Sequence, residues 1–198
     1  MLIYVVTDRR LRPDLPPMVM ARQAARCGAD MLQIREKDLP GGELLALASA
    51  AADERGAEVF VNGRPDVALA AGANVHLPSD GLPPAQVGAL WGGAMRIGVS
   101  VHGAAAARTA EAQGADFVTC GPVFDTPSKR AYGPPLGLAG LEEALRAVSI
   151  PVLAIGGVGP GNLRQLARLG VPGVAVVSAV IGAPDMAAAL DALRGASS

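Results

Sequence analysis

Short apolar segments alternate along the chain with longer stretches in which alanine and leucine recur at helical spacing. Eight of the apolar segments are only four to six residues long, and most of their side chains are apolar on both faces. That pattern is typical of strands buried within a parallel sheet. We therefore predict strands at Leu2–Val6, Met31–Ile34, Glu58–Val61, Asn74–Leu77, Met95–Ser100, Phe117–Cys120, Val152–Ile155 and Gly173–Val177.

The stretches between these strands predict helices. Several open with proline, which is favoured in the first helical turn, and several are followed by a glycine that suits a left-handed C-terminal cap. The predicted capping glycines are Gly28, Gly56, Gly72, Gly114 and Gly170. The predicted helices are Met18–Cys27, Gly42–Arg55, Pro65–Ala71, Pro83–Leu90, Ala104–Gln113, Leu138–Val148, Pro160–Leu169 and Pro184–Arg194.

Eight strands alternating with helices predict an α/β fold, a (β/α)8 TIM barrel. With 198 residues it would be a minimal barrel, and we expect residues 1–198 to form a single domain. The alternative is a doubly wound open sheet, which usually carries a glycine-rich nucleotide loop straight after its first strand. Here the first strand is followed by Thr7-Asp8-Arg9-Arg10, which does not fit that alternative.

Composition narrows the class of protein further. Hydrophobic residues make up 51% and charged residues 18% of the chain, which excludes a disordered protein. The net charge of −1 excludes a general electrostatic binder of nucleic acid. Cys27 and Cys120 lack the spacing of a zinc site. The first apolar run is too short for a signal peptide, and no run could span a bilayer, so we expect a cytoplasmic protein. A homodimer is compatible with the sequence, which does not fix the oligomeric state.

Polar residues collect where the predicted strands end, the place where barrels of this kind carry their sites. After the second strand, alternation places Gln33, Arg35 and Lys37 on the face aimed at the barrel axis. Two inward cations need an anion to neutralise them. The alternative is a surface ion-pair network with Glu36 and Asp38.

Three later strand ends carry further candidates for anion binding. The long loop after the sixth strand holds Thr126, Ser128 and Lys129, which suits a lid that grips phosphate, although an ordinary solvated loop is the alternative. Gly157 follows the seventh strand and Ser178 the eighth, where barrels frequently hold a phosphate. A tight glycine turn is the alternative there. The residues together predict binding of a phosphorylated, anionic small molecule.

The motifs at these strand ends resemble those of the thiamine phosphate synthase/TenI family, in order and nearly from end to end. They are Tyr4–Asp8, Gln33–Lys37, Val61-Asn62, Val75–Leu77, Gly98–His102, Gly121–Phe124 with Thr126–Lys129, Ala154–Gly157 and Val176–Ala179.

The resemblance implies a TIM barrel and a transferase of thiamine biosynthesis. Such a synthase joins hydroxymethylpyrimidine pyrophosphate to thiazole phosphate and releases pyrophosphate. Arg35, Lys37, Lys129 and Ser100 would then act in catalysis, with Ser100 positioning the pyrimidine. The residues implied to bind the two substrates are Gln33, Arg35, Lys37, Asn62, Thr126, Ser128 and Lys129 for the pyrimidine pyrophosphate, and Gly157, Val177 and Ser178 for the thiazole phosphate.

The resemblance also implies Mg²⁺, but the expected ligands differ in this chain. The family's aspartate directly after the third-strand asparagine is Gly63 here, and its second acidic position is Gly81. Asp80, one residue earlier, is the remaining candidate ligand. Asp66 is more consistent with an outward position on the following helix, since a hard cation needs several convergent oxygens.

Two other functions of the family's relatives stay open. One is a TenI-like thiazole phosphate tautomerase, which needs no metal and moves a proton with a histidine where this chain has Pro122. His76 or His102 could replace that histidine, or both could be hydrogen-bonded structural residues. The other is a non-catalytic protein that binds a thiamine precursor. Cys120, at a strand end, is interpreted as a buried inert thiol.

Overall fold

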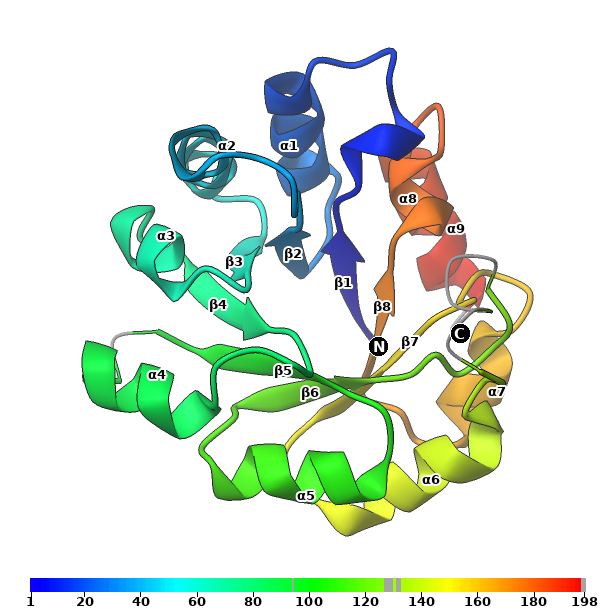
Figure 1. The fold of residues 1–198 in the computed structure, drawn as a ribbon. Helices are drawn as coiled ribbons and strands as arrows, with labels where there is room; N and C mark the ends of the chain where they lie inside the picture. The colour runs from blue at the N-terminus through cyan, green and yellow to red at the C-terminus, as the bar shows by residue number, and fades with distance from the viewer. Residues whose placement is uncertain (94, 127–129, 131–132, 197–198) are drawn as a thin grey trace.

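Eight parallel strands close into a barrel, with each strand paired to the next and β8 paired to β1 (Figure 1). The structure is a computed structural model that describes residues 1–93, 95–126, 130 and 133–196. The closed barrel of eight parallel strands confirms the predicted TIM barrel. The strands are β1 Leu2–Val6, β2 Met31–Ile34, β3 Glu58–Asn62, β4 Asn74–Leu77, β5 Ile97–Val101, β6 Phe117–Cys120, β7 Val152–Ile155 and β8 Gly173–Val176.

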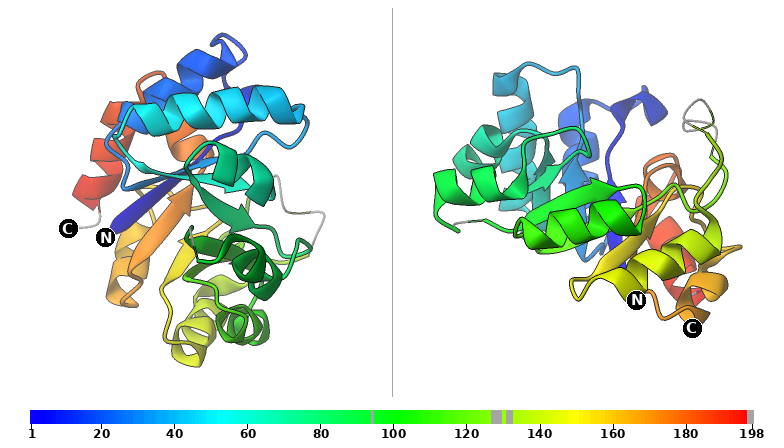
Figure 2. Two further views of the ribbon diagram at one scale, coloured as in Figure 1. Left: turned by 90° about the vertical axis from the view of Figure 1, so that its left-hand side faces the viewer. Right: turned by 60° about the horizontal axis from the view of Figure 1, so that its bottom comes forward.

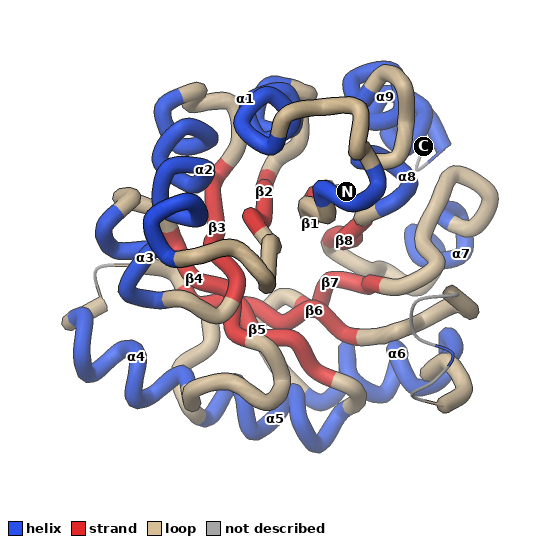
Figure 3. Tube along the Cα trace, turned by 45° about the horizontal axis from the view of Figure 1, so that its top comes forward, coloured by secondary structure: helices blue, strands red, loops and turns tan. Residues whose placement is uncertain are grey.

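Helices surround the strands on the outside (Figure 3). The last helix, α9, packs next to α1, so the two ends of the chain complete the ring (Figure 2). The helices are η1 (a 3₁₀ turn) Arg9–Leu11, α1 Pro17–Arg26, α2 Gly41–Asp53, α3 Pro65–Ala70, α4 Pro84–Trp91, α5 Ala104–Ala112, α6 Gly137–Ala147, α7 Leu163–Arg168, α8 Ser178–Ile181 and α9 Met186–Ala196. In the described part of the chain, none of these helices is long and apolar enough to cross a membrane.

The structure corrects several predicted boundaries. The prediction missed η1 and α8, because three and four residues are too few to show a helical period. The helix predicted from Pro160 begins only at Leu163. The side chain of Asn162 accepts from Gly159 N and donates to Gly157 O, which holds the preceding residues in a turn.

One predicted cap is also wrong. Gly28, Gly72, Gly114 and Gly170 have positive φ as expected, but after α2 the residue with positive φ is Arg55, at +51°. Gly56 is required for a different reason, since a Cβ there would lie 2.1 Å from Ala25 O. The glycine lets the chain pass close to the end of α1.

Two hydrophobic clusters form the core, one between the barrel and its helices and one inside the barrel. The inner cluster contains Tyr4, Phe60 and Phe117, whose rings meet edge to face with centroids 5.3–5.7 Å apart. Gly98 makes room for them, because a Cβ there would lie 2.4 Å from Phe117 Cζ and 2.7 Å from His76 Nδ1. The interior below the strand ends is therefore filled with side chains, as in other barrels.

Candidate active site at the mouth of the barrel

The carboxyl ends of the eight parallel strands meet at one end of the barrel, which we call the mouth. Gln33 lies in β2, Asn62 ends β3 and Ser100 lies in β5. Gly157 follows β7 by two residues, while Val177 and Ser178 come directly after β8. The fold thus brings residues from five strands that are far apart in sequence to the same end.

Below the mouth, polar side chains form a hydrogen-bonded chain inside the barrel. Gln33 Nε2 donates to Tyr4 Oη at 3.0 Å, and Tyr4 Oη lies 3.3 Å from His76 Nδ1. His76 Nε2 lies 2.9 Å from Ser100 Oγ, and Thr119 Oγ1 lies 3.4 Å from both of those atoms. Ser100 is half-buried, whereas the other four side chains are buried. We call these five residues the interior chain.

Burial decides the charge states in the interior chain. It lowers the pKa of His76 to about 3, with a further contribution from the positive charge of Arg35, so the imidazole is neutral at physiological pH. Burial raises the pKa of Tyr4 well above its usual value. These states favour a hydrogen-bonding role for His76 over proton exchange. Tyr4 and Thr119 were not predicted as site residues. Strand alternation places both on the inner face, and Tyr4 also stands in a motif that carries the family resemblance.

At the rim of the mouth, a cavity of about 150 Å³ is lined by charged residues. Strand pairing of β2 ends at Ile34, so the predicted alternation does not extend through Arg35 and Lys37. Arg35 is half-buried and Lys37 is exposed, yet both line this cavity. The backbone N–H of Arg35 donates to Thr7 Oγ1 at 2.9 Å, which fixes the turn after the strand. The cavity lining is Asp8, Arg10, Arg35, Glu36, Lys37 and Asp38.

The ion pairs at this rim differ from the predicted network. Arg9 Nη1 lies 3.2 Å from Glu36 and 2.6 Å from Asp38, and this contact lowers the pKa of Asp38 to about 2. Asp8 pairs with Arg10 at 2.8 Å. Among the residues that the structure describes, neither Arg35 nor Lys37 forms an ion pair. Their charges are therefore available to an anionic ligand.

The loops after β6 and β7 pack against each other. Val123 N donates to Ile155 O at 2.8 Å and Phe124 N to Gly156 O at 3.0 Å. Gly157 has φ +65°, and a Cβ there would lie 2.7 Å from Asp125 O, so the turn itself requires glycine. Thr126 is half-buried, while Ser128 and Lys129 lie outside the described residues, so their predicted role remains a prediction.

Two further residues near the mouth have defined environments. His102 is exposed, and its Nδ1 lies 2.6 Å from Gly121 O. A carbonyl oxygen only accepts, so Nδ1 carries the hydrogen there. Cys120 is buried and free, and burial raises the pKa of its thiol to about 11. This environment supports the interpretation of Cys120 as an inert thiol.

The described residues do not fit the magnesium site that the family resemblance implied. Gly63 has no side chain to offer, Asp80 is exposed, and Asp66 pairs with Arg64 at 2.6 Å. Within the described ranges, no group of three or more histidine, cysteine, aspartate or glutamate residues could hold a metal ion. No step of the chemistry can therefore be assigned to a metal held by these side chains.

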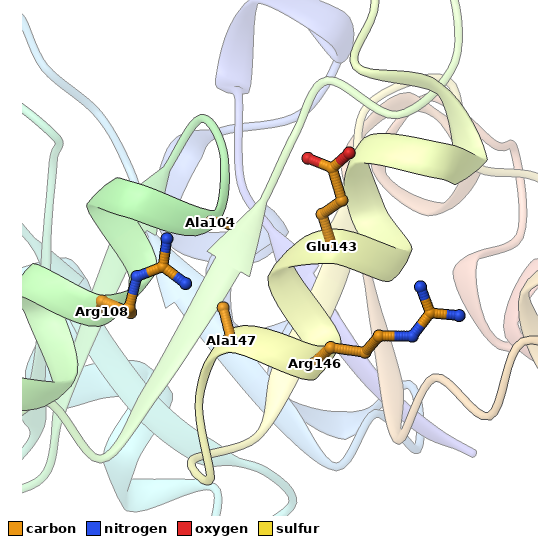
Figure 4. A pocket seen from close by; sticks show the side chains of 5 residues that line it. All are labelled: Ala104, Arg108, Glu143, Arg146 and Ala147. Atoms are coloured by element: carbon orange, nitrogen blue, oxygen red, sulfur yellow. The ribbon is translucent and has the colours of Figure 1, made fainter.

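A second hollow, of about 280 Å³, lies on the outside of the barrel between α5 and α6 (Figure 4). It is lined by Arg108 of α5 and by Glu143 and Arg146 of α6, among others. None of the predicted site residues that the structure describes lines it, so it is distinct from the mouth.

Comparison with known proteins agrees with the geometry. A model of the family described as thiamine monophosphate synthase matches residues 3–180. The thiamine-phosphate synthase of Methanoculleus marisnigri is 44% identical over 196 residues, covering 97% of this chain and 93% of the relative. That of Roseiflexus castenholzii is 43% identical over 196 residues, covering 97% and 86%.

A solved structure agrees as well. The thiamine phosphate pyrophosphorylase from Pyrococcus furiosus superimposes with a TM-score of 0.89 at 36% identity, covering 99% of this chain and 95% of the other. The predicted resemblance is thereby confirmed. A match of this extent in sequence and in fold shows that the chain belongs to the thiamine monophosphate synthase family.

Proposed function

We propose that this protein is a transferase of thiamine biosynthesis that joins hydroxymethylpyrimidine pyrophosphate to thiazole phosphate and releases pyrophosphate. The observation that carries the proposal is that one end of the barrel holds two kinds of group. Arg35 and Lys37 form no ion pair in the described part of the chain, and Ser100 and Gln33 are half-buried and buried polar residues of the strands that end there. An anionic pyrophosphate leaving group and a neutral heterocycle need these two kinds of environment in one site.

In the proposed reaction the bond between the pyrimidine methylene carbon and the pyrophosphate oxygen breaks, and the electron pair leaves on the oxygen. The thiazole nitrogen then supplies its lone pair to form the new carbon–nitrogen bond. Arg35 and Lys37 stabilise the charge that develops on the leaving group. Gln33, Asn62 and Ser100 hold the pyrimidine in line.

The thiazole phosphate is assigned to the turns after β7 and β8, at Gly157, Val177 and Ser178. Thr126, Ser128 and Lys129 are assigned to the pyrophosphate. Because the described carboxylates do not fit a magnesium site, the protein's own contribution to charge neutralisation is assigned to the side-chain cations. A cytoplasmic location and a homodimeric state stay predictions, which cell fractionation and light scattering would check.

A second candidate function is the metal-independent tautomerase, which moves a proton on a thiazole phosphate. The observation that favours it is Gly63, which stands where the family resemblance implies a metal ligand in a synthase and which a tautomerase does not need to replace. His102, exposed at the end of β5, is then the group positioned to exchange a proton. A protein that only binds the precursor is the third outcome of the same test.

A product assay separates these functions. The protein is mixed with both substrates, in Mg²⁺ and in EDTA, and thiamine phosphate is converted to fluorescent thiochrome. We expect product, and its dependence on Mg²⁺ reports whether the pyrophosphate brings its own metal. If no product forms while thiazole phosphate still binds, the synthase proposal is wrong. Proton exchange on the thiazole phosphate, lost in His102→Gln, would then establish the tautomerase.

A further inference from the structure

The interior chain has a direction, because each of its members has a limited set of donors and acceptors. Gln33 Nε2 is an amide nitrogen that only donates, so Tyr4 Oη accepts from it. The phenol hydrogen of Tyr4 is then left for its other neighbour, His76 Nδ1, at 3.3 Å. His76 Nδ1 therefore accepts.

A neutral imidazole carries one hydrogen, and its position follows from that acceptance. Burial keeps His76 neutral, and Nδ1 accepts, so the hydrogen is on Nε2. Nε2 lies 2.9 Å from Ser100 Oγ and donates to it. Thr119 Oγ1 also donates to Ser100 Oγ, at 3.4 Å.

Ser100 is the point where this buried chain reaches the mouth. With the imidazole hydrogen on Nε2, and with Thr119 donating, its oxygen accepts from both of these buried neighbours, and its own hydrogen is then used by neither of them. Ser100 is half-buried, so that hydrogen is left for a partner at the mouth. A serine hydroxyl normally rotates to donate or accept; here the residues behind it fix it as a donor.

We propose that Tyr4 and His76 are positioning residues that hold the Ser100 hydroxyl as a hydrogen-bond donor, so that the site takes a ligand presenting an acceptor, such as an unprotonated ring nitrogen, at Ser100. In assigning that acceptor to the pyrimidine, the inference rests on the proposed function. The direction of the chain itself is independent of which heterocycle binds. A ring that presents an N–H at this place is rejected, because two hydrogens would face each other.

The packing around His76 fixes the orientation of its imidazole ring. Gly98 leaves the space that His76 and Phe117 occupy, since a Cβ there would lie 2.7 Å from His76 Nδ1. The rings of Tyr4 and Phe117 pack at 5.7 and 5.8 Å from that of His76. The imidazole is thereby held with one nitrogen toward Tyr4 and the other toward Ser100.

The first test needs no ligand and no activity. The chain has two histidines, so ¹⁵N-histidine spectra show two imidazoles, and His102→Gln identifies His76. We expect His76 to be the tautomer with hydrogen on Nε2, and in Tyr4→Phe, which removes its donor, to become a mixture. Hydrogen on Nδ1 in the native protein, or an unchanged tautomer in Tyr4→Phe, would overturn the proposal.

The second test measures the consequence for the ligand. In Tyr4→Phe, KM for hydroxymethylpyrimidine pyrophosphate should rise about tenfold, the effect of losing one hydrogen bond, with less than about a twofold change for thiazole phosphate. Ser100→Ala should give the same split. Phe60→Leu is the control, because it alters packing against Tyr4 without touching the chain of hydrogen bonds.

The two tests distinguish failure of the proposed function from failure of the positioning role. If the native protein makes no thiamine phosphate, the proposed function fails while the histidine spectra still decide the positioning role. If product forms and KM in Tyr4→Phe stays native, or rises equally for both substrates, the positioning role fails while the proposed function stands. Circular dichroism of each variant is the check that the barrel is folded.

Discussion

The mouth of the barrel combines two regions that treat polar groups in opposite ways. The interior chain is neutral and buried, and its members face other protein groups at hydrogen-bond distance. The rim is charged and more exposed, and Arg35 and Lys37 there form no ion pair in the part of the chain described. From this difference we infer a division of labour, in which the interior fixes the orientation of the ligand and the rim supplies charge for its anionic group. Substitutions in the two regions should therefore have different effects on the protein.

The largest effect is expected at the rim. Arg35→Met removes one of the two unpaired cations and should lower kcat/KM by about 100- to 1,000-fold, because that charge acts on the leaving group in the transition state. Steady-state thiochrome assays measure it. Arg108→Met, on the outer face of α5, is the matched control and should be native. Equal losses in the two variants would show that overall charge, and not the rim, matters.

A substitution that disturbs packing in the interior should lower the stability of the protein. Gly98→Ala places a methyl group 2.4 Å from Phe117 Cζ and 2.7 Å from His76 Nδ1, so the rings must move. Overpacking of this kind costs about 1–3 kcal/mol of unfolding free energy. Urea denaturation measures it, with Gly42→Ala, where a Cβ meets nothing within 4 Å, as the control. Native stability of Gly98→Ala would show that the barrel interior is looser than the packing indicates.

The charge state of the interior should also appear in the pH dependence of stability. The pKa of His76 is about 3 in the folded protein and about 6.5 in the unfolded chain, so between these values the unfolded state binds more protons. Stability is then complete above pH 6.5 and is lost as the pH falls, by about 2 kcal/mol from pH 7.5 to 5. Urea denaturation at several pH values measures the slope.

A variant identifies the source of that slope. His76→Asn should be less stable at pH 7.5 but should lose little more at pH 5. If the pH dependence of stability persists in His76→Asn, it arises from other groups. It would then give no evidence that His76 is neutral.

The sequence predicted the barrel well, because eight repeats of one alternation reinforce one another and small errors at single boundaries do not accumulate. It placed Gln33 and Ser100 near strand ends, as the structure does, while their part in binding stays a prediction. It could not predict the role of Tyr4, because an aromatic residue in a strand is ordinary core until a polar partner from another strand, here His76, is seen beside it. Nor could it show that the Glu36 and Asp38 carboxylates pair with Arg9, which leaves Arg35 and Lys37 to the ligand.

The smallest expected effect concerns Mg²⁺ binding, and it tests whether the rim binds its anion through side-chain cations. Gly63 has φ +67°, a conformation that aspartate and asparagine tolerate better than most residues. A Cβ there would meet Pro78 Cδ at 3.6 Å and Pro78 Cγ at 3.8 Å, which are ordinary contacts. Gly63→Asp restores the acidic position that the family resemblance implies, beside the strand-four loop that carries Asp80. It should give a rise in melting temperature of about 1–3 °C in millimolar Mg²⁺, the size of one weak binding site.

Gly63→Asn is the matched control for that variant, since it keeps the shape and removes the charge. A shift in Gly63→Asp alone would mean that one carboxylate completes a metal site and that the native rim works through Arg35 and Lys37 in its place. Equal melting temperatures with and without Mg²⁺ in both variants would mean that the rim has no remaining ligands, and that its anion site rests on side-chain cations even when the aspartate is restored.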